Sequence, residues 1–172
     1  MTAIVVYESI YGNTREVAEA IAAGLGDARA VSIHDVVSSV TKADMLVVGG
    51  PTHVHGLTSK RSRTAALDNA HGDVEPGAGD EPGLRDWLAD LPQVANAQGA
   101  AFDTRADAAP MLTGAASHGI ARRLRRHGYR LLGTESFIVE AAEGPLAEGE
   151  LERAREWGTT LAKALRAPAG AA

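Results

Sequence analysis

Hydroxyl, amide and glycine residues gather in one short loop near the start of the chain. Residues 9–14 read Ser-Ile-Tyr-Gly-Asn-Thr, follow the apolar run 3–7 and precede a segment of helical periodicity. Such a junction turns several backbone N–H groups and the positive end of a helix dipole toward one point, which suits a phosphate. The loop contains no lysine. We therefore expect a terminal phosphate monoester held by N–H and hydroxyl donors, rather than a triphosphate clamped by a P-loop lysine.

Two further loops are expected at the same edge of a sheet. Residues 49–58 read Gly-Gly-Pro-Thr-His-Val-His-Gly-Leu-Thr and follow the apolar run 45–48, and residues 103–117 follow the apolar run 98–102. In an open doubly wound sheet, ligands bind beyond the C-terminal ends of the strands, where the strand order reverses. Three loops at that edge can surround a phosphate, a ribityl chain and a planar ring system.

Apolar runs and helical periodicities alternate along the chain. The expected strands are short and rich in β-branched residues, as in a parallel sheet covered on both faces. They span residues 3–7, 29–33, 45–48, 98–102 and 129–139, the last interrupted near 133–134. The expected helices are one capped by Thr14, then 36–40, 62–67 with 84–91, 117–127 and 148–165. This alternation predicts an α/β fold, a three-layer doubly wound sheet of five parallel strands. We expect one domain over residues 1–166 and a frayed tail at 167–172.

The last expected helix has one apolar face. The residues along it are Leu151, Ala154, Trp157, Leu161 and Leu165. Their spacing is that of a helix packed against a sheet. Trp87 has a similar position within residues 84–91, so burial in the core is the expected role of both tryptophans.

An acidic segment rich in glycine and proline divides the third helical region. It covers residues 68–82, and its composition predicts a surface loop. A solvated insertion is the favoured interpretation, and a functional lid or docking element is the alternative.

Composition excludes several classes of function. The chain has 172 residues, a net charge of −5, a pI near 5.7 and no cysteine. Disulfides, thiol catalysis, iron–sulfur ligation and cysteine zinc sites are therefore ruled out. The acidic balance argues against broad nucleic-acid binding. We see neither a signal peptide nor an apolar run long enough for a membrane span, so a soluble, cytoplasmic protein is expected.

Competing phosphate-binding and hydrolytic motifs are missing. No Gly-x-Gly-x-x-Gly follows the first strand, and the chain has no Walker A pattern and no Gly-x-Ser-x-Gly elbow. These absences disfavour a dinucleotide-binding Rossmann unit and a hydrolase. Glu8-Ser9 does not supply the paired acids of a receiver domain.

The whole chain resembles the flavodoxin family. Residues 9–14 match that family's phosphate-loop pattern Thr/Ser-x-x-Gly-Asn/x-Thr, and Gly-Gly-Pro-Thr at 49–52 lies where its second flavin loop belongs. The resemblance implies the strand order 2-1-3-4-5, with FMN as the cofactor. It implies that the phosphate is bound by Ser9, Ile10, Tyr11, Gly12, Asn13 and Thr14. It also implies that the isoalloxazine ring lies against Pro51, Thr52, His53, Val54, His55 and Gly56 on one side and against Asp103, Thr104 and Arg105 on the other.

The flavin loops of this chain depart from the family's usual pattern. Flavodoxins usually sandwich the ring between aromatic side chains, whereas neither loop here contains Trp, Tyr or Phe before residue 117. We therefore expect a reduction potential less negative than that of an electron-carrier flavodoxin. His53 and His55 also permit a metal site, although no third or fourth ligand stands at a readable spacing. Flavin contact or substrate protonation is the favoured role of these histidines.

Several arginines have two interpretations. Arg15, in the first helical turn, is expected to face solvent rather than phosphate. Arg122, Arg123, Arg125 and Arg126 are expected to form a solvated helix face. Lys60, Arg61 and Arg63 are expected to lie beside the flavin edge, where they would attract an acidic partner or a nucleotide phosphate.

The expected function is redox chemistry through a bound flavin. One hypothesis is an electron shuttle that docks to a redox partner protein. Another is a small FMN-dependent oxidoreductase acting on NAD(P)H or on a small-molecule acceptor such as a quinone. A third is a cofactor-free, flavodoxin-fold protein that acts by interaction.

Overall fold

Five parallel strands form the centre of the computed structural model, which describes residues 1–36, 40, 42–53, 56–107 and 114–167. The strands are β1 (Ala3–Tyr7), β2 (Arg29–Ser32), β3 (Met45–His53), β5 (Gln98–Ala106) and β6 (Arg130–Val139). Their order is β2-β1-β3-β5-β6, and the two-residue β4 (Gly56–Leu57) pairs antiparallel with the end of β3. The predicted order 2-1-3-4-5 is therefore confirmed, with β4 as an added hairpin strand.

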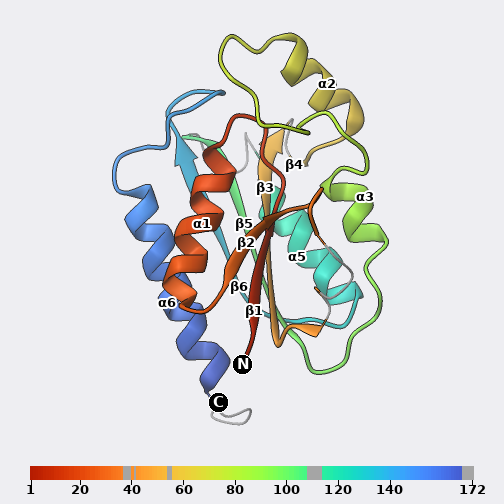
Figure 1. The fold of residues 1–172 in the computed structure, drawn as a ribbon, viewed down its shortest axis with the longest axis vertical. Helices are drawn as coiled ribbons and strands as arrows, with labels where there is room; N and C mark the ends of the chain where they lie inside the picture. The colour runs from red at the N-terminus through yellow and green to blue at the C-terminus, as the bar shows by residue number, and fades with distance from the viewer. Residues whose placement is uncertain (37–39, 41, 54–55, 108–113, 168–172) are drawn as a thin grey trace.

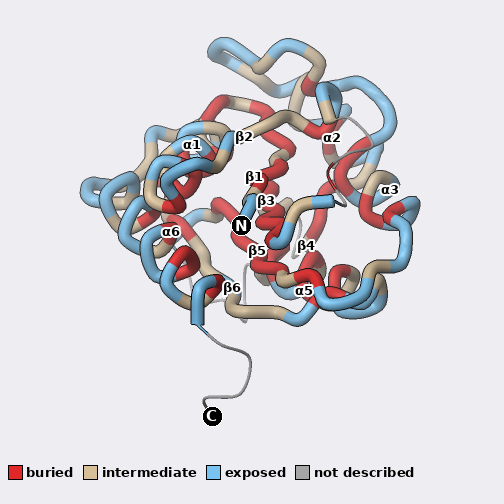
Figure 2. Tube along the Cα trace, turned by 60° about the horizontal axis from the view of Figure 1, so that its bottom comes forward, coloured by how far each residue is buried: buried red, intermediate tan, exposed pale blue. Residues whose placement is uncertain are grey.

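Helices cover both faces of this sheet (Figure 1). On one face, α1 (Asn13–Leu25) and α6 (Glu150–Arg166) pack with side chains such as Val5, Met45 and Val47. On the other, α3 (Leu84–Ala89) and α5 (Ala116–Arg126) pack with alternate residues of the same strands, such as Val6, Leu46 and Val48. Successive strand residues point to opposite faces, so both faces must be apolar, as the sequence predicts. In Figure 2 the buried segments are concentrated in this central sheet.

The remaining helix, α2 (Lys60–Asp68), lies beyond the C-terminal edge of the sheet, at the top of Figure 1. Its N-terminus has a reciprocal cap, in which the Ser59 hydroxyl accepts from the Ser62 N–H at 3.2 Å and the Ser62 hydroxyl accepts from the Ser59 N–H at 2.9 Å. Such a capping box satisfies backbone donors that a helix start leaves unpaired. The helix thus begins two residues before the predicted position 62.

The strands that carry the expected flavin loops are longer than predicted. The ladder between β3 and β5 continues through Gly49, Gly50 and Pro51, and β5 extends to Ala106. Pairing with a parallel neighbour outweighs the turn-forming composition that ended the predicted strands. As a result, Thr52, His53 and Thr104 are held by the sheet rather than by free loops.

Two other expectations need correction, and a third concerns residues that the structure mostly does not describe. Thr14 does not cap α1, because the helix begins one residue earlier and its N-cap is Gly12, whose φ of 91° suits glycine. Leu151 is 43% exposed, since it lies in the first turn of α6, and Trp157 is only half-buried. The predicted helix at 36–40 lies mostly outside the described residues.

Close contact between α1 and α6 depends on two glycines. A Cβ at Gly158 would lie 2.3 Å from the Ile21 carbonyl oxygen, and a Cβ at Gly24 would lie 2.0 Å from that of Arg155. Only glycine permits this approach of two helix backbones.

None of the helices in the described residues is long and apolar enough to cross a membrane.

Candidate functional site

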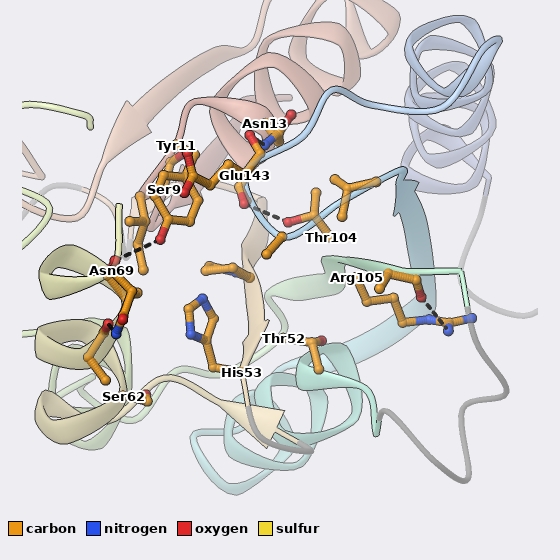
Figure 3. A pocket seen from close by; sticks show the side chains of 18 of the residues that line it. Ser9, Tyr11, Asn13, Thr52, His53, Ser62, Asn69, Thr104, Arg105 and Glu143 are labelled. Atoms are coloured by element: carbon orange, nitrogen blue, oxygen red, sulfur yellow. Dashed lines mark hydrogen bonds between the residues drawn. The ribbon is translucent and has the colours of Figure 1, made fainter. Parts of the chain in front are cut away.

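A cavity of about 560 Å³ lies at the C-terminal edge of the sheet, between the first loop and the ends of β3 and β5 (Figure 3). This is the place where β1 and β3 lead the chain in opposite directions across the sheet, the usual ligand site of a doubly wound fold. The volume is within the range of small-molecule and cofactor sites. Its walls are formed by Ser9, Ile10, Tyr11, Asn13, Thr14, Pro51, Thr52, His53, Ser62, Ala65, Ala66, Asn69, His71, Thr104, Arg105, Ala106, Val139, Ala142 and Glu143.

The first loop is held in a fixed shape by its own serine. The buried Ser9 hydroxyl accepts hydrogen bonds from the N–H groups of Gly12 at 3.2 Å and of Arg15 at 3.4 Å. Thr14, also buried, shares a 2.8 Å hydrogen bond between its hydroxyl and that of Thr104. The loop that starts α1 is thereby joined to the end of β5, and both line the cavity (Figure 3).

The connection between β6 and α6 closes another side of the cavity. The Asn13 side-chain amide donates to the Glu143 carbonyl oxygen at 3.0 Å, and the Tyr11 hydroxyl donates to the Ala66 carbonyl oxygen at 2.9 Å. Burial, with the nearby charge of Glu143, raises the pKa of the Tyr11 phenol. Tyr11 therefore links the first loop to α2 as a neutral donor.

The acidic segment 68–82 is a largely exposed surface loop, as predicted, and it also contacts the first loop. The Glu75 N–H donates to the Ile10 carbonyl oxygen at 2.7 Å, and the Glu75 carboxylate accepts from Arg15 Nε at 3.0 Å. The same carboxylate lies beside the N-cap of α1, since a Cβ at Gly12 would be 3.2 Å from Glu75 Oε1. Arg15 is thus engaged in ion pairs with Glu75 and Glu19 instead of facing solvent alone.

A second carboxylate fastens the same segment. Glu143 accepts from the N–H groups of His71 at 2.9 Å and Gly72 at 3.0 Å. The backbone hydrogen bond from His71 is the main cause that holds the pKa of the Glu143 carboxyl below its usual value. The negative charges of Glu75 and Glu143 therefore lie near a loop whose N–H groups suit an anion. They would repel an anion bound there.

His53 brings an imidazole ring into the middle of the cavity wall (Figure 3). Burial lowers the pKa of this imidazole, and the charge of Glu8 opposes that shift without cancelling it. The ring is therefore neutral at neutral pH, with one nitrogen as donor and the other as acceptor.

A buried ion pair joins the end of β1 to α2, and local sequence patterns did not predict it. Glu8 and Arg63 are each 2% exposed, with Arg63 Nη1 at 3.5 Å from Glu8 Oε1. Glu8 also accepts from the Leu84 N–H at 3.0 Å and from the Thr58 hydroxyl, and Arg63 donates to Glu81 at 2.7 Å. Arg63 is therefore not part of an exposed basic cluster, because α2 turns it inward to meet a carboxylate at the end of β1.

The predicted site residues fall into three groups. Those that line the cavity are Ser9, Ile10, Tyr11, Asn13, Thr14, Pro51, Thr52, His53, Thr104 and Arg105. Those outside its lining are Gly12, Gly56 and Asp103. Val54 and His55 lie outside the described residues.

Asp103 instead stabilises a helix start. Its side chain is fully buried, and one carboxylate oxygen accepts from the Ser117 N–H at 2.7 Å, in the first turn of α5. A negative charge at a helix N-terminus is favourable.

Some lining residues were not predicted from the sequence. They come from α2, from the segment after α2 and from the segment after β6, and examples are Ser62, His71 and Glu143. Contacts over 55 residues or more, such as that of Tyr11 with Ala66, help to bring these segments to the cavity.

Comparison with known proteins agrees with this geometry. The family model for the flavodoxin domain matches residues 4–63. No curated protein sequence matches the chain.

Solved structures match over nearly the whole chain. A flavodoxin from the domain Archaea has 22% identity and a TM-score of 0.63, covering 97% of this chain and 100% of its own. A Streptococcus pneumoniae flavodoxin has 18% identity and a TM-score of 0.64, covering 95% of this chain and 99% of its own. Oxidised flavodoxin 1 from Bacillus cereus has 18% identity and a TM-score of 0.62, covering 95% and 98%. The chain therefore matches the flavodoxin domain over residues 4–63 and shares the flavodoxin fold over nearly its whole length.

Proposed function

We propose that this protein binds FMN in the cavity described above and acts in electron transfer through the bound flavin. The observation that carries the proposal is the cavity itself, which joins the first loop to the ends of β3 and β5 at the reversal of strand order. Flavodoxins are FMN-binding proteins. The residues present fit this cofactor, because hydroxyl and N–H donors lie at one end and a largely apolar wall lies beside them.

The phosphate end would be held by the loop that begins α1. The available donors are the backbone N–H groups of Tyr11, Asn13 and Thr14 and the side-chain hydroxyls of the loop. The Gly12 N–H already donates to the Ser9 hydroxyl, which accepts two bonds but keeps its own proton to donate. Each charge-assisted hydrogen bond to a phosphate is worth about 1.5–3 kcal/mol. A few such bonds can hold the group although Arg15 is engaged with Glu75.

The ring end would lie between Pro51, Thr52 and His53 on one side and Thr104 and Arg105 on the other. Among the described lining residues, the only phenyl-type ring is that of Tyr11, and its hydroxyl is bound to α2. Ring stacking, which disfavours a negatively charged reduced flavin, is therefore reduced. We expect a flavin potential less negative than that of an electron-carrier flavodoxin.

Bound FMN supplies the electron and hydride chemistry, whereas the protein binds it and tunes its electronics. His53 is the residue placed to hold or deliver a proton beside the ring, because its neutral imidazole lines the cavity. This observation favours a second candidate function, an FMN-dependent oxidoreductase that acts on NAD(P)H or a quinone. The two carboxylates near the first loop favour a third, a cofactor-free interaction protein.

A titration separates these functions. We expect the purified chain to bind FMN one-to-one, and riboflavin about 100-fold more weakly or worse, because riboflavin lacks the phosphate. Equal affinity for both would mean that the first loop does not bind phosphate. Failure to bind either would overturn the proposal in favour of the cofactor-free function. Oxidation of NADPH with a quinone and no added protein would identify the oxidoreductase.

A further inference from the structure

Four arginines from two helices form a basic surface beside β4. They are Arg85 on α3 and Arg122, Arg123 and Arg126 on α5; we refer to them as the arginine surface. Three of them are exposed and Arg123 is half-buried. Their closeness is evident at Arg123, because burial and the positive charges of Arg85, Arg126 and Arg122 together lower the pKa of its guanidinium.

No carboxylate neutralises these charges. Across the part of the chain that the structure describes, none of the four forms an ion pair, although the whole chain has a net charge of −5. Asp86, next to Arg85 in the first turn of α3, and Asp90, at the C-terminal end of that helix, form an ion pair with none of them. An unneutralised cluster of positive charges on an acidic protein creates a local potential that attracts negative partners.

Two of the guanidinium groups are held in place by carbonyl oxygens. Arg85 donates to Leu57 at 2.7 Å and to Thr58 at 3.1 Å, and Arg123 donates to Gly119 at 3.1 Å. These bonds fix the side chains without cancelling their charge. A fixed arginine loses less conformational entropy on binding than a free one.

The arginine surface begins one strand away from the cavity. In the hairpin, Thr52 and His53 of β3 pair with Leu57 and Gly56 of β4, and Arg85 is bonded to the carbonyl of Leu57. On the far side of β4, the Leu57 side chain packs against Gly119, where a Cβ would lie 3.3 Å away. Figure 1 shows α3, α5 and β4 on the same side of the sheet. A partner seated on these arginines would therefore lie next to the His53 wall of the cavity.

We propose that the arginine surface is the docking site of an acidic redox protein that exchanges electrons with the ligand of the cavity. This inference rests on the proposed function and adds the chemistry of the partner. The four arginines spread over two helices rather than converging on one point, and none of them lines the cavity. That arrangement fits an extended acidic protein face better than a single phosphate group. Rim charges of this kind mainly speed the encounter of two proteins and fix their orientation.

The test uses the FMN-loaded chain with an acidic [2Fe–2S] ferredoxin as the probe and the basic protein cytochrome c as its opposite. The first variant combines R85E, R122E and R126E, which change exposed residues and leave Arg123 in place. The matched control combines R29E, R155E and R166E, exposed residues on β2 and α6 with the same change in charge. Dissociation constants are measured by calorimetry at low and high salt, on the FMN-loaded and the FMN-free chain.

We expect the ferredoxin to bind the wild-type chain more tightly than cytochrome c does, and to lose about 10-fold in affinity between 20 and 300 mM salt. The first variant should lose about 10-fold or more, and the control less than about 3-fold. Equal losses in both variants, or preferred binding of cytochrome c, would overturn the proposal. Binding of duplex DNA at the same affinity as ferredoxin would assign the surface to nucleic acid instead. If FMN binds but docking fails, only this inference falls; if FMN does not bind, the proposed function falls, and docking on the FMN-free chain is judged separately.

Discussion

Removing the guanidinium of Arg63 should leave Glu8 as an isolated charge in the core. Both side chains are 2% exposed, and their 3.5 Å pair joins the end of β1 to α2. Substitution R63M keeps most of the apolar stem and removes only the charged head. Glu8 would retain two donors, the Thr58 hydroxyl and the Leu84 N–H.

The expected loss of stability is about 3 kcal/mol, at the lower end of the 3–5 kcal/mol found when one partner of a buried ion pair is removed. The lower end applies because the two remaining donors still solvate the Glu8 carboxylate. The second partner of Arg63, Glu81, is 41% exposed and returns to water at little cost. A loss of about 3 kcal/mol is a large part of the 5–15 kcal/mol that stabilises a typical domain.

Urea unfolding followed by tryptophan fluorescence measures this effect. With an m-value of about 2 kcal/mol/M, the midpoint should fall by about 1.5 M urea in R63M. The control is the double variant E8Q/R63M, which removes the isolated charge and should regain much of the loss, as buried pairs replaced together often do. A loss below about 1 kcal/mol in R63M, or a double variant no more stable than the single one, would refute the reasoning.

Three further outcomes are expected. The substitution E75Q should tighten FMN binding about 3- to 10-fold and leave riboflavin binding unchanged, because it removes a like charge near the phosphate loop; an equal gain for both ligands would contradict a phosphate effect. The substitution G158A should lower the melting temperature strongly, since its Cβ would lie 2.3 Å from the Ile21 carbonyl oxygen; an unchanged melting temperature would show that α1 and α6 can separate at no cost. Burial lowers the pKa of His53, so its neutral ring is favoured in the folded protein. The stability that this provides is complete at pH values above 6.5, the ordinary pKa of histidine, and is lost as the pH falls through the lower pKa of the folded state. H53N should therefore flatten the stability profile below about pH 6.5, as measured by urea midpoints, and an unchanged slope would mean that His53 is not the titrating group.

Three features follow from the amino-acid pattern alone: the alternation of strands and helices, the two-sided apolar sheet and the loop at residues 9–14. These features are local: β-branched runs predict buried strands, and a glycine with hydroxyl residues before a helical period predicts an anion-binding helix start. The same reasoning located the ends of β3 and β5 as cavity walls, because parallel strands must end at one edge. His53, Thr14 and Thr104 all line the cavity as this argument requires.

The contacts between polar side chains, in contrast, depend on the three-dimensional fold. Arg63 has the sequence context of an exposed arginine, and its burial depends on Glu8, 55 residues away. Glu75 lies in a segment whose composition predicts a solvated loop, yet it reaches Arg15 across 60 residues. Asp103 follows a strand like a ligand-binding residue, but the start of α5 offers it a buried N–H. Such pairings depend on charges brought together by folding, and local patterns do not encode them.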